Sequence, residues 1–175
     1  MIFYKSPLES DNEYVMLLGL VSARWSMMEE ALAHLLGHIL ENLDTGYQLY
    51  FCTSSFRQRI ELIKAAAKSE LAEDTENQIS AIVSKVYDAY KARNKMIHEP
   101  YHAMLTVDGE QVSAPTLSDG SEPNIKWIGR GHYGDPERIN KGSYEGHLAK
   151  LDRLLGYVVW EIHGLNDEAP EQSEE

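Results

Sequence analysis

The segment from Arg93 to His98 brings a guanidinium, a carboxamide and an imidazole close together in the sequence. An imidazole with an ordinary pKa of about 6.5 can take up and release a proton near neutral pH. A guanidinium can hold a phosphate through two parallel hydrogen bonds and stabilise the charge that develops on it. Arg93 and His98 could therefore perform acid–base chemistry on a phosphate group, with Asn94 orienting the imidazole or the phosphate.

Arg93 also interrupts an apolar stripe on the helix that carries it. A buried guanidinium without a partner costs on the order of several kcal/mol, so Arg93 must have a partner or face a wet cleft. A purely structural alternative is that Arg93 pairs with Glu29 or Glu30 of the first helix while His98 caps carbonyls at the helix end. The other members of the stripe follow the spacing of a packed seam, and they are Ile79, Val83, Val86, Tyr90 and Ile97.

The segment resembles the R-x(4–6)-H motif of the HEPN superfamily, in which a polar residue often follows the Arg. The resemblance covers the helical frame, residues 11–98 and 143–164. It implies a small helical bundle and a homodimer in which two motifs meet in one cleft. It also implies a metal-independent endoribonuclease without a cofactor, in which the RNA 2′-OH is the nucleophile. His98 would then be the acid/base, Arg93 the phosphate clamp and Asn94 the orienting group.

Many HEPN proteins belong to toxin–antitoxin or defence systems, so the resemblance adds an antitoxin or another protein as a partner. HEPN-like proteins without nuclease activity also exist, and the alternative is a non-catalytic dimeric binding or scaffold protein. Four further residues are candidate substrate contacts. Lys91 and Lys95, with Lys85 nearby, either guide an RNA phosphate or form a solvated charged face, and Tyr101 and His102 follow the motif directly.

Three capping boxes predict where the helices of this frame begin. They are Ser10–Glu13, Ser55–Gln58 and Thr75–Gln78. With the apolar periodicity they predict four principal helices, at about 11–43, 56–71, 76–98 and 143–163. Asp44-Thr45-Gly46 is read as the stop after the first helix, and Pro100 ends the third near His98.

The first and last helices carry apolar stripes that define their buried faces. The first helix has a second apolar face, which predicts contact with another chain or a covering loop. Its members are Met16, Leu20, Met27 and Ala31. The main stripe of the first helix is Leu18, Val21, Trp25, Met28, Leu32, Leu35, Ile39 and Leu43, and that of the last helix is Leu148, Leu151, Leu155, Val158 and Ile162.

An insertion at 101–142 separates the last two helices of a single domain, residues 1–165. Asp108-Gly109 is a hairpin turn signal between Ala103–Val107 and Glu110–Val112, and a third strand is expected at Ile125–Ile128. Residues 166–175 contain five acids and no base, which predicts a disordered acidic tail. The fold class is therefore mainly α, with a small β-hairpin or irregular insertion.

Composition limits the function classes. The 175 residues carry a formal net charge of −12, which disfavours binding of nucleic acid or anionic membrane through overall charge. The single cysteine, Cys52, excludes an internal disulfide and a cysteine zinc cluster. The chain shows neither a basic secretory leader nor the roughly 20 apolar residues of a membrane span. These features predict a cytoplasmic protein that does not bind membranes.

Overall fold

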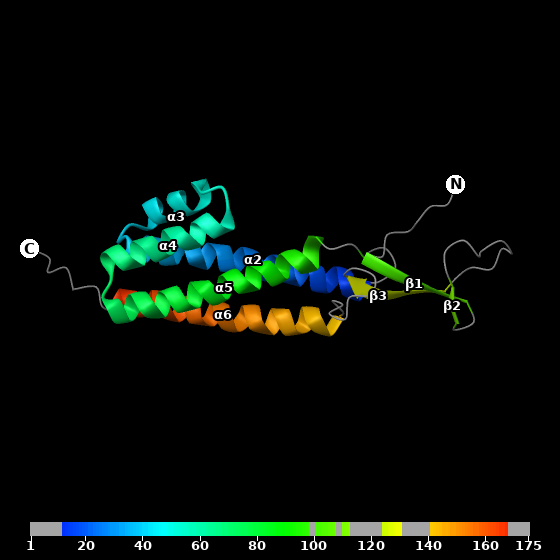
Figure 1. The fold of residues 1–175 in the computed structure, drawn as a ribbon. Coiled ribbons are helices and arrows are strands. Elements are labelled where there is room, and N and C mark those ends of the chain that lie inside the picture. Colours follow the sequence, from blue (N-terminus) through cyan, green and yellow to red (C-terminus); the bar gives the residue numbers. More distant parts are fainter. Residues whose placement is uncertain (1–11, 99–100, 108–109, 113–123, 131–140, 168–175) are drawn as a thin grey trace, which may run out of the picture.

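The computed structural model describes residues 12–98, 101–107, 110–112, 124–130 and 141–167. This part of the chain is mainly helical, as the sequence predicts, and its four long helices pack as an elongated bundle (Figure 1). The helices are α2 (Asn12–Ile39), α3 (Leu43–Cys52), α4 (Phe56–Glu70), α5 (Glu73–His98) and α6 (Lys141–Asp167).

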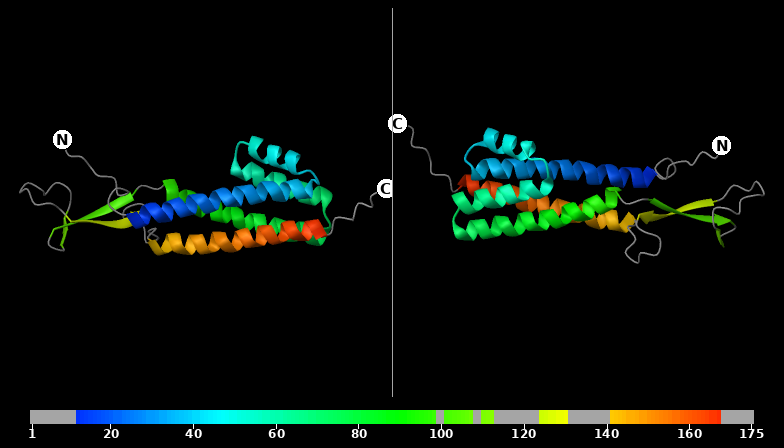
Figure 2. Two further views of the ribbon diagram at one scale, coloured as in Figure 1. Left: turned by 180° about the vertical axis from the view of Figure 1, so that it is seen from behind. Right: turned by 45° about the horizontal axis from the view of Figure 1, so that its top comes forward.

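Helix α2 packs along α6 and carries the short α3 against its C-terminal half, while α5 packs between α4 and α6. The two views of Figure 2 show α3 on the outside of the bundle. The core gathers the inner faces of α2, α4, α5 and α6, with Trp25 edge-on to Phe56 at 5.0 Å between ring centroids. Most of the predicted main stripe of α2 is buried, but Leu43 is exposed.

The prediction of one helix from 11 to 43 is wrong at its C-terminal end, because α3 is a separate helix that begins at Leu43. Helix α2 ends at Ile39, Glu41 takes a positive φ of 51°, and Asn42 caps a new helix by accepting a hydrogen bond from the Thr45 amide at 2.9 Å. Gly46 is therefore no stop signal. A Cβ at Gly46 would lie 2.3 Å from the Gly37 Cα, so this glycine lets α3 lie directly on α2.

The other helix ends show which capping signals operate. Ser55 caps α4 by accepting a hydrogen bond from the Gln58 amide at 3.3 Å, which confirms that predicted start. The predicted start at Thr75 is wrong by a turn, because α5 begins at Glu73. Helix α5 ends at His98, as predicted. Ser10 lies outside the described residues, so the first capping box is only partly covered.

Three strands follow α5. They are β1 (Tyr101–Val107), β2 (Glu110–Val112) and β3 (Asn124–Arg130), in the antiparallel order β2-β1-β3. Leu105 lies opposite Val112 in the β1–β2 pair, and the β1–β3 register shifts between His102 and Ala103. The turn at 108–109 and residues 113–123 and 131–140 of the predicted insertion lie outside the described residues, as do residues 168–175 of the predicted tail.

Within the described part of the chain, every helix is too short or too polar to cross a lipid bilayer.

Candidate functional site

Arg93 lies in the seam of α5 where that helix faces α6. The buried residues on either side of it are Ala89 and Met96, four residues before and three after, which is the spacing of a packed seam. The guanidinium is half-buried, and its Nη1 donates a hydrogen bond to Asn94 Oδ1 at 3.0 Å. Its Nε is buried and has no hydrogen-bond partner among the described residues. Arg93 is thus held at one edge by Asn94, while its Nε is shielded from solvent.

The two acids considered as partners for Arg93 are engaged elsewhere. Glu29 Oε1 accepts a hydrogen bond from Arg59 Nη1 at 2.6 Å, and Glu30 Oε1 lies 3.7 Å from His34 Nε2. Arg93 forms no ion pair with any acid whose side chain is described. The Arg59–Glu29 pair, and not Arg93, therefore provides the half-buried ionic link between α4 and α2.

His147 of α6 is the site residue that the sequence reasoning missed. Its side chain is only 5% exposed, and its Nε2 has no hydrogen-bond partner among the described residues. Burial, together with the positive charges of Lys150 and Arg93, lowers the pKa of His147 from 6.5 to about 4. His147 is therefore a neutral imidazole at pH 7, close enough to sense the Arg93 guanidinium.

The predicted stripe of α6 is confirmed at Leu151 and Val158, but Leu148, Leu155 and Ile162 are only partly buried. The predicted stripe and the buried set both have alternating spacings of three and four residues, so the spacing alone did not single out His147. The buried set is Tyr144, His147, Leu151, Leu154 and Val158.

Tyr144 anchors the end of α5 that carries the motif. Its hydroxyl donates a hydrogen bond to the Met96 carbonyl at 3.1 Å, and both side chains are buried in a small cluster with Leu17 and Val21 of α2. The sequence between Arg93 and His98 is therefore fixed at its middle by contacts to two other helices. A shift of the last turn of α5 would break a buried hydrogen bond.

His98 is exposed at the last residue of α5. On an α-helix, Asn94 and His98 are one turn apart and about 40° apart around the axis, whereas Arg93 and His98 are about 140° apart. One chain therefore presents Arg93 and His98 on different sides of α5. Asn94 lies between them, and its hydrogen bond turns the Arg93 guanidinium toward the His98 side.

The structure describes the side chains of two of the four candidate substrate contacts, Lys91 and Lys95. Lys91 Nζ lies 2.6 Å from Asp88 Oδ1 and 5.2 Å from the Tyr87 ring centroid. Its pairing with Asp88 raises the pKa of Lys91 and lowers that of Asp88. Lys95 is half-buried and interacts with another group of the protein. Tyr101 and His102 belong to β1, and their side chains lie outside the described part of the structure.

The described side chains offer a half-buried guanidinium, an amide and an exposed imidazole near one helix end, with a buried neutral imidazole on α6. They contain no group of three or more His, Cys, Asp or Glu residues placed to hold a metal ion. Comparison of the chain with protein-family models, curated proteins and solved structures finds no match.

Proposed function

We propose that the chain is a HEPN-like, metal-independent endoribonuclease whose catalytic residues are Arg93, Asn94 and His98. The observation that carries the proposal is a half-buried Arg93 guanidinium in a bundle seam, fixed by the hydrogen bond from Nη1 to Asn94 Oδ1 and without an ion pair to any acid whose side chain is described. A guanidinium fixed at one edge and lacking an acidic partner can bind an anionic group such as a phosphate.

In this mechanism, His98 removes the proton of the RNA 2′-OH, and the 2′ oxygen attacks the adjacent phosphorus. The bond from phosphorus to the 5′ oxygen breaks, and an imidazolium returns a proton to that leaving oxygen. The products are a 2′,3′-cyclic phosphate and a 5′-OH end. Arg93 holds the non-bridging oxygens and stabilises the charge of the transition state, and Asn94 orients the guanidinium toward the reacting phosphate.

The mechanism requires two copies of the chain. Because Arg93 and His98 lie about 140° apart on α5, a homodimer would combine Arg93 of one copy with His98 of the other, and two His98 residues would supply the base and the acid. The second apolar face of α2 supports such an assembly. Its Met16, Leu20 and Met27 are 56%, 42% and 46% exposed, although Ala31 is buried.

The strands after α5 begin three residues beyond His98, so the insertion directly follows the proposed catalytic segment in the sequence. We place the protein in the cytoplasm, as a toxin or defence component controlled by a protein partner such as an antitoxin. The deciding experiment is RNA cleavage by the purified protein in EDTA, beside His98→Ala and Arg93→Lys. Cleavage lost in His98→Ala and reduced in Arg93→Lys supports the proposal, and cleavage unchanged in both variants refutes the assigned roles.

A second candidate is a non-catalytic dimeric binding protein. It is favoured by an apolar groove of about 560 Å³ between α2 and α6, on a face of the bundle away from the α4–α5 side. The groove is an ordinary size for a bound side chain or ligand. This candidate predicts a stable dimer by light scattering and no RNA turnover. The groove is lined by Ser26, Met27, Glu30, Ala31, His34, Leu155, Val159 and Ile162.

A further inference from the structure

A second groove, of about 450 Å³, lies between α4 and α5 and is mainly charged. The helices are antiparallel, and each contributes four residues at the spacing i, i+3, i+4, i+7, so the two sets face each other along the groove. Three of the lining residues are cationic in a chain with a net charge of −12. The lining residues are Arg57, Ile60, Glu61 and Lys64 from α4 and Ser84, Tyr87, Asp88 and Lys91 from α5.

Two of the three cations of this groove are available to a ligand. Asp88 is neutralised by Lys91, whose Nζ lies 2.6 Å from its carboxylate. Arg57 and Lys64 form no ion pair with any described residue. They lie seven residues apart on α4, about 10.5 Å along the helix axis. Glu61 lies between them and repels phosphate at the middle of the groove, so phosphates would bind at its two ends.

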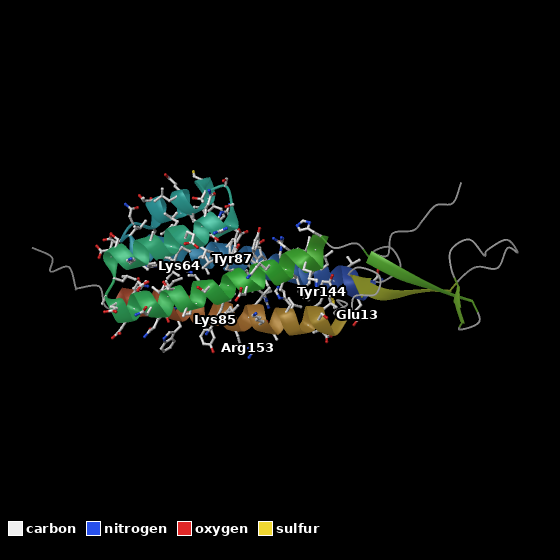
Figure 3. All side chains as sticks on the ribbon, in the orientation of Figure 1. Glu13, Lys64, Lys85, Tyr87, Tyr144 and Arg153 are labelled. Atoms are coloured by element: carbon white, nitrogen blue, oxygen red, sulfur yellow. The ribbon has the colours of Figure 1, made fainter. Side chains whose placement is uncertain are left out.

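The groove leads to the proposed catalytic residue. Ser84, Tyr87, Lys91, Lys95 and His98 recur every three or four residues and so form one stripe along α5. Helix α5 extends beyond the start of α4 (Figure 1). Arg57, next to the start of α4, and Lys91, seven residues before the end of α5, line the groove at its end nearer His98. Figure 3 places Lys64 and Tyr87 at the α4–α5 boundary and Lys85 on the α6 side of α5.

We propose that the α4–α5 groove binds the single-stranded RNA next to the phosphate cleaved at His98, with Arg57 and Lys64 contacting its phosphates. The proposal rests on the endoribonuclease function and names its substrate class. The groove volume of about 450 Å³ is in the range of sites that take a nucleotide-sized group. Single-strand binding sites combine a cationic groove with aromatic side chains. Tyr87 is the aromatic residue of this lining, and Lys91 Nζ lies 5.2 Å from its ring centroid.

The test compares two double variants in the His98→Ala background, in which the RNA stays intact. Arg57→Gln/Lys64→Gln removes one Arg and one Lys from the groove, and Lys85→Gln/Arg153→Gln removes the same charges from the opposite, α6 side. Binding of a fluorescein-labelled single-stranded RNA is followed by anisotropy between 50 and 200 mM salt. The groove variant should bind roughly tenfold more weakly. Its slope of log K against log[salt] should fall in magnitude by about 1.4, because each single-strand phosphate contact contributes about 0.7.

Equal RNA affinities and equal salt slopes of the two double variants would overturn the proposed role of the groove in RNA binding, even where the wild-type protein cleaves RNA. Stronger binding of a matched duplex, or binding of polyglutamate without binding of RNA, would overturn it as well. The endoribonuclease function is tested separately by cleavage with the wild-type protein. Groove-dependent RNA binding without cleavage would refute the nuclease and leave the groove as an RNA-binding site.

Discussion

Protonation of His147 should destabilise the fold, and the pH at which this happens follows from its burial. The side chain is 5% exposed and lies near the positive charges of Lys150 and Arg93, which together with desolvation lower its pKa from 6.5 to about 4. The unfolded chain therefore binds a proton at this residue at a higher pH than the folded chain does. The stabilising contribution is fully present above pH 6.5 and is lost as the pH falls toward 4.

The magnitude can be worked from this pKa. A lowering from 6.5 to about 4 corresponds to about 3.4 kcal/mol when the loss is complete. Between pH 7.5 and pH 5, about 2 kcal/mol of this should be lost. Other groups also titrate in this range, so the relevant quantity is the difference between the wild-type protein and His147→Gln, which keeps a polar side chain but cannot titrate.

Urea unfolding of both proteins at the two pH values measures this difference in the free energy of unfolding. The wild-type protein should lose about 2 kcal/mol more than His147→Gln between pH 7.5 and pH 5. NMR titration of the imidazole, assigned by its disappearance in the variant, gives the pKa directly. A His147 pKa above 6 would refute the buried neutral imidazole. So would a difference in the free energy of unfolding between the wild-type protein and His147→Gln that stays constant within about 0.5 kcal/mol between the two pH values.

Three further predictions concern the contacts that hold the bundle. Gly46→Ala should destabilise the protein by about 1–3 kcal/mol in urea unfolding, because the added Cβ would lie 2.3 Å from the Gly37 backbone. Gly19→Ala is the control, since the space around Gly19 is open, and it should stabilise the protein by up to about 1 kcal/mol. Equal effects of the two would contradict the close α2–α3 contact. Tyr144→Phe should cost about 1 kcal/mol through the lost hydrogen bond to Met96, and Tyr157→Phe, at an exposed position, should cost almost nothing. Glu29→Gln should lower the thermal midpoint of the protein more than Asp152→Asn does, because the Arg59–Glu29 pair is largely buried and the Arg24–Asp152 pair is exposed. A larger drop in the midpoint for Asp152→Asn in a melting scan would contradict this ranking.

The sequence was sufficient for the helices whose ends carry local signals. Ser55 with Gln58 marks the start of α4, and His98 before Glu99-Pro100 marks the end of α5. The boundary between α2 and α3 could not be read this way. Gly46 is a turn residue by type, and only the tertiary approach of α3 to α2 shows that it serves close packing.

For the candidate site, the sequence identified the unusual position of Arg93 but neither its neighbour nor its orientation. The position follows from the seam spacing of α5, which is a local pattern. His147 is 54 positions away on α6, and its contact depends on how α5 and α6 align, which periodicity on one helix does not specify. The side of α5 toward which the guanidinium turns depends on one hydrogen bond to Asn94.

The second apolar face of α2 also has a chemical vulnerability. Its Met16 and Met27 residues are 56% and 46% exposed, whereas Met28 and Met96 are buried in the core. A mild oxidant would convert the two outer methionines to sulfoxides first, and each sulfoxide is a polar group. Oxidation would therefore leave the packing of the bundle intact while making this face of α2 unsuitable for apolar association, and methionine sulfoxide reductases would restore it.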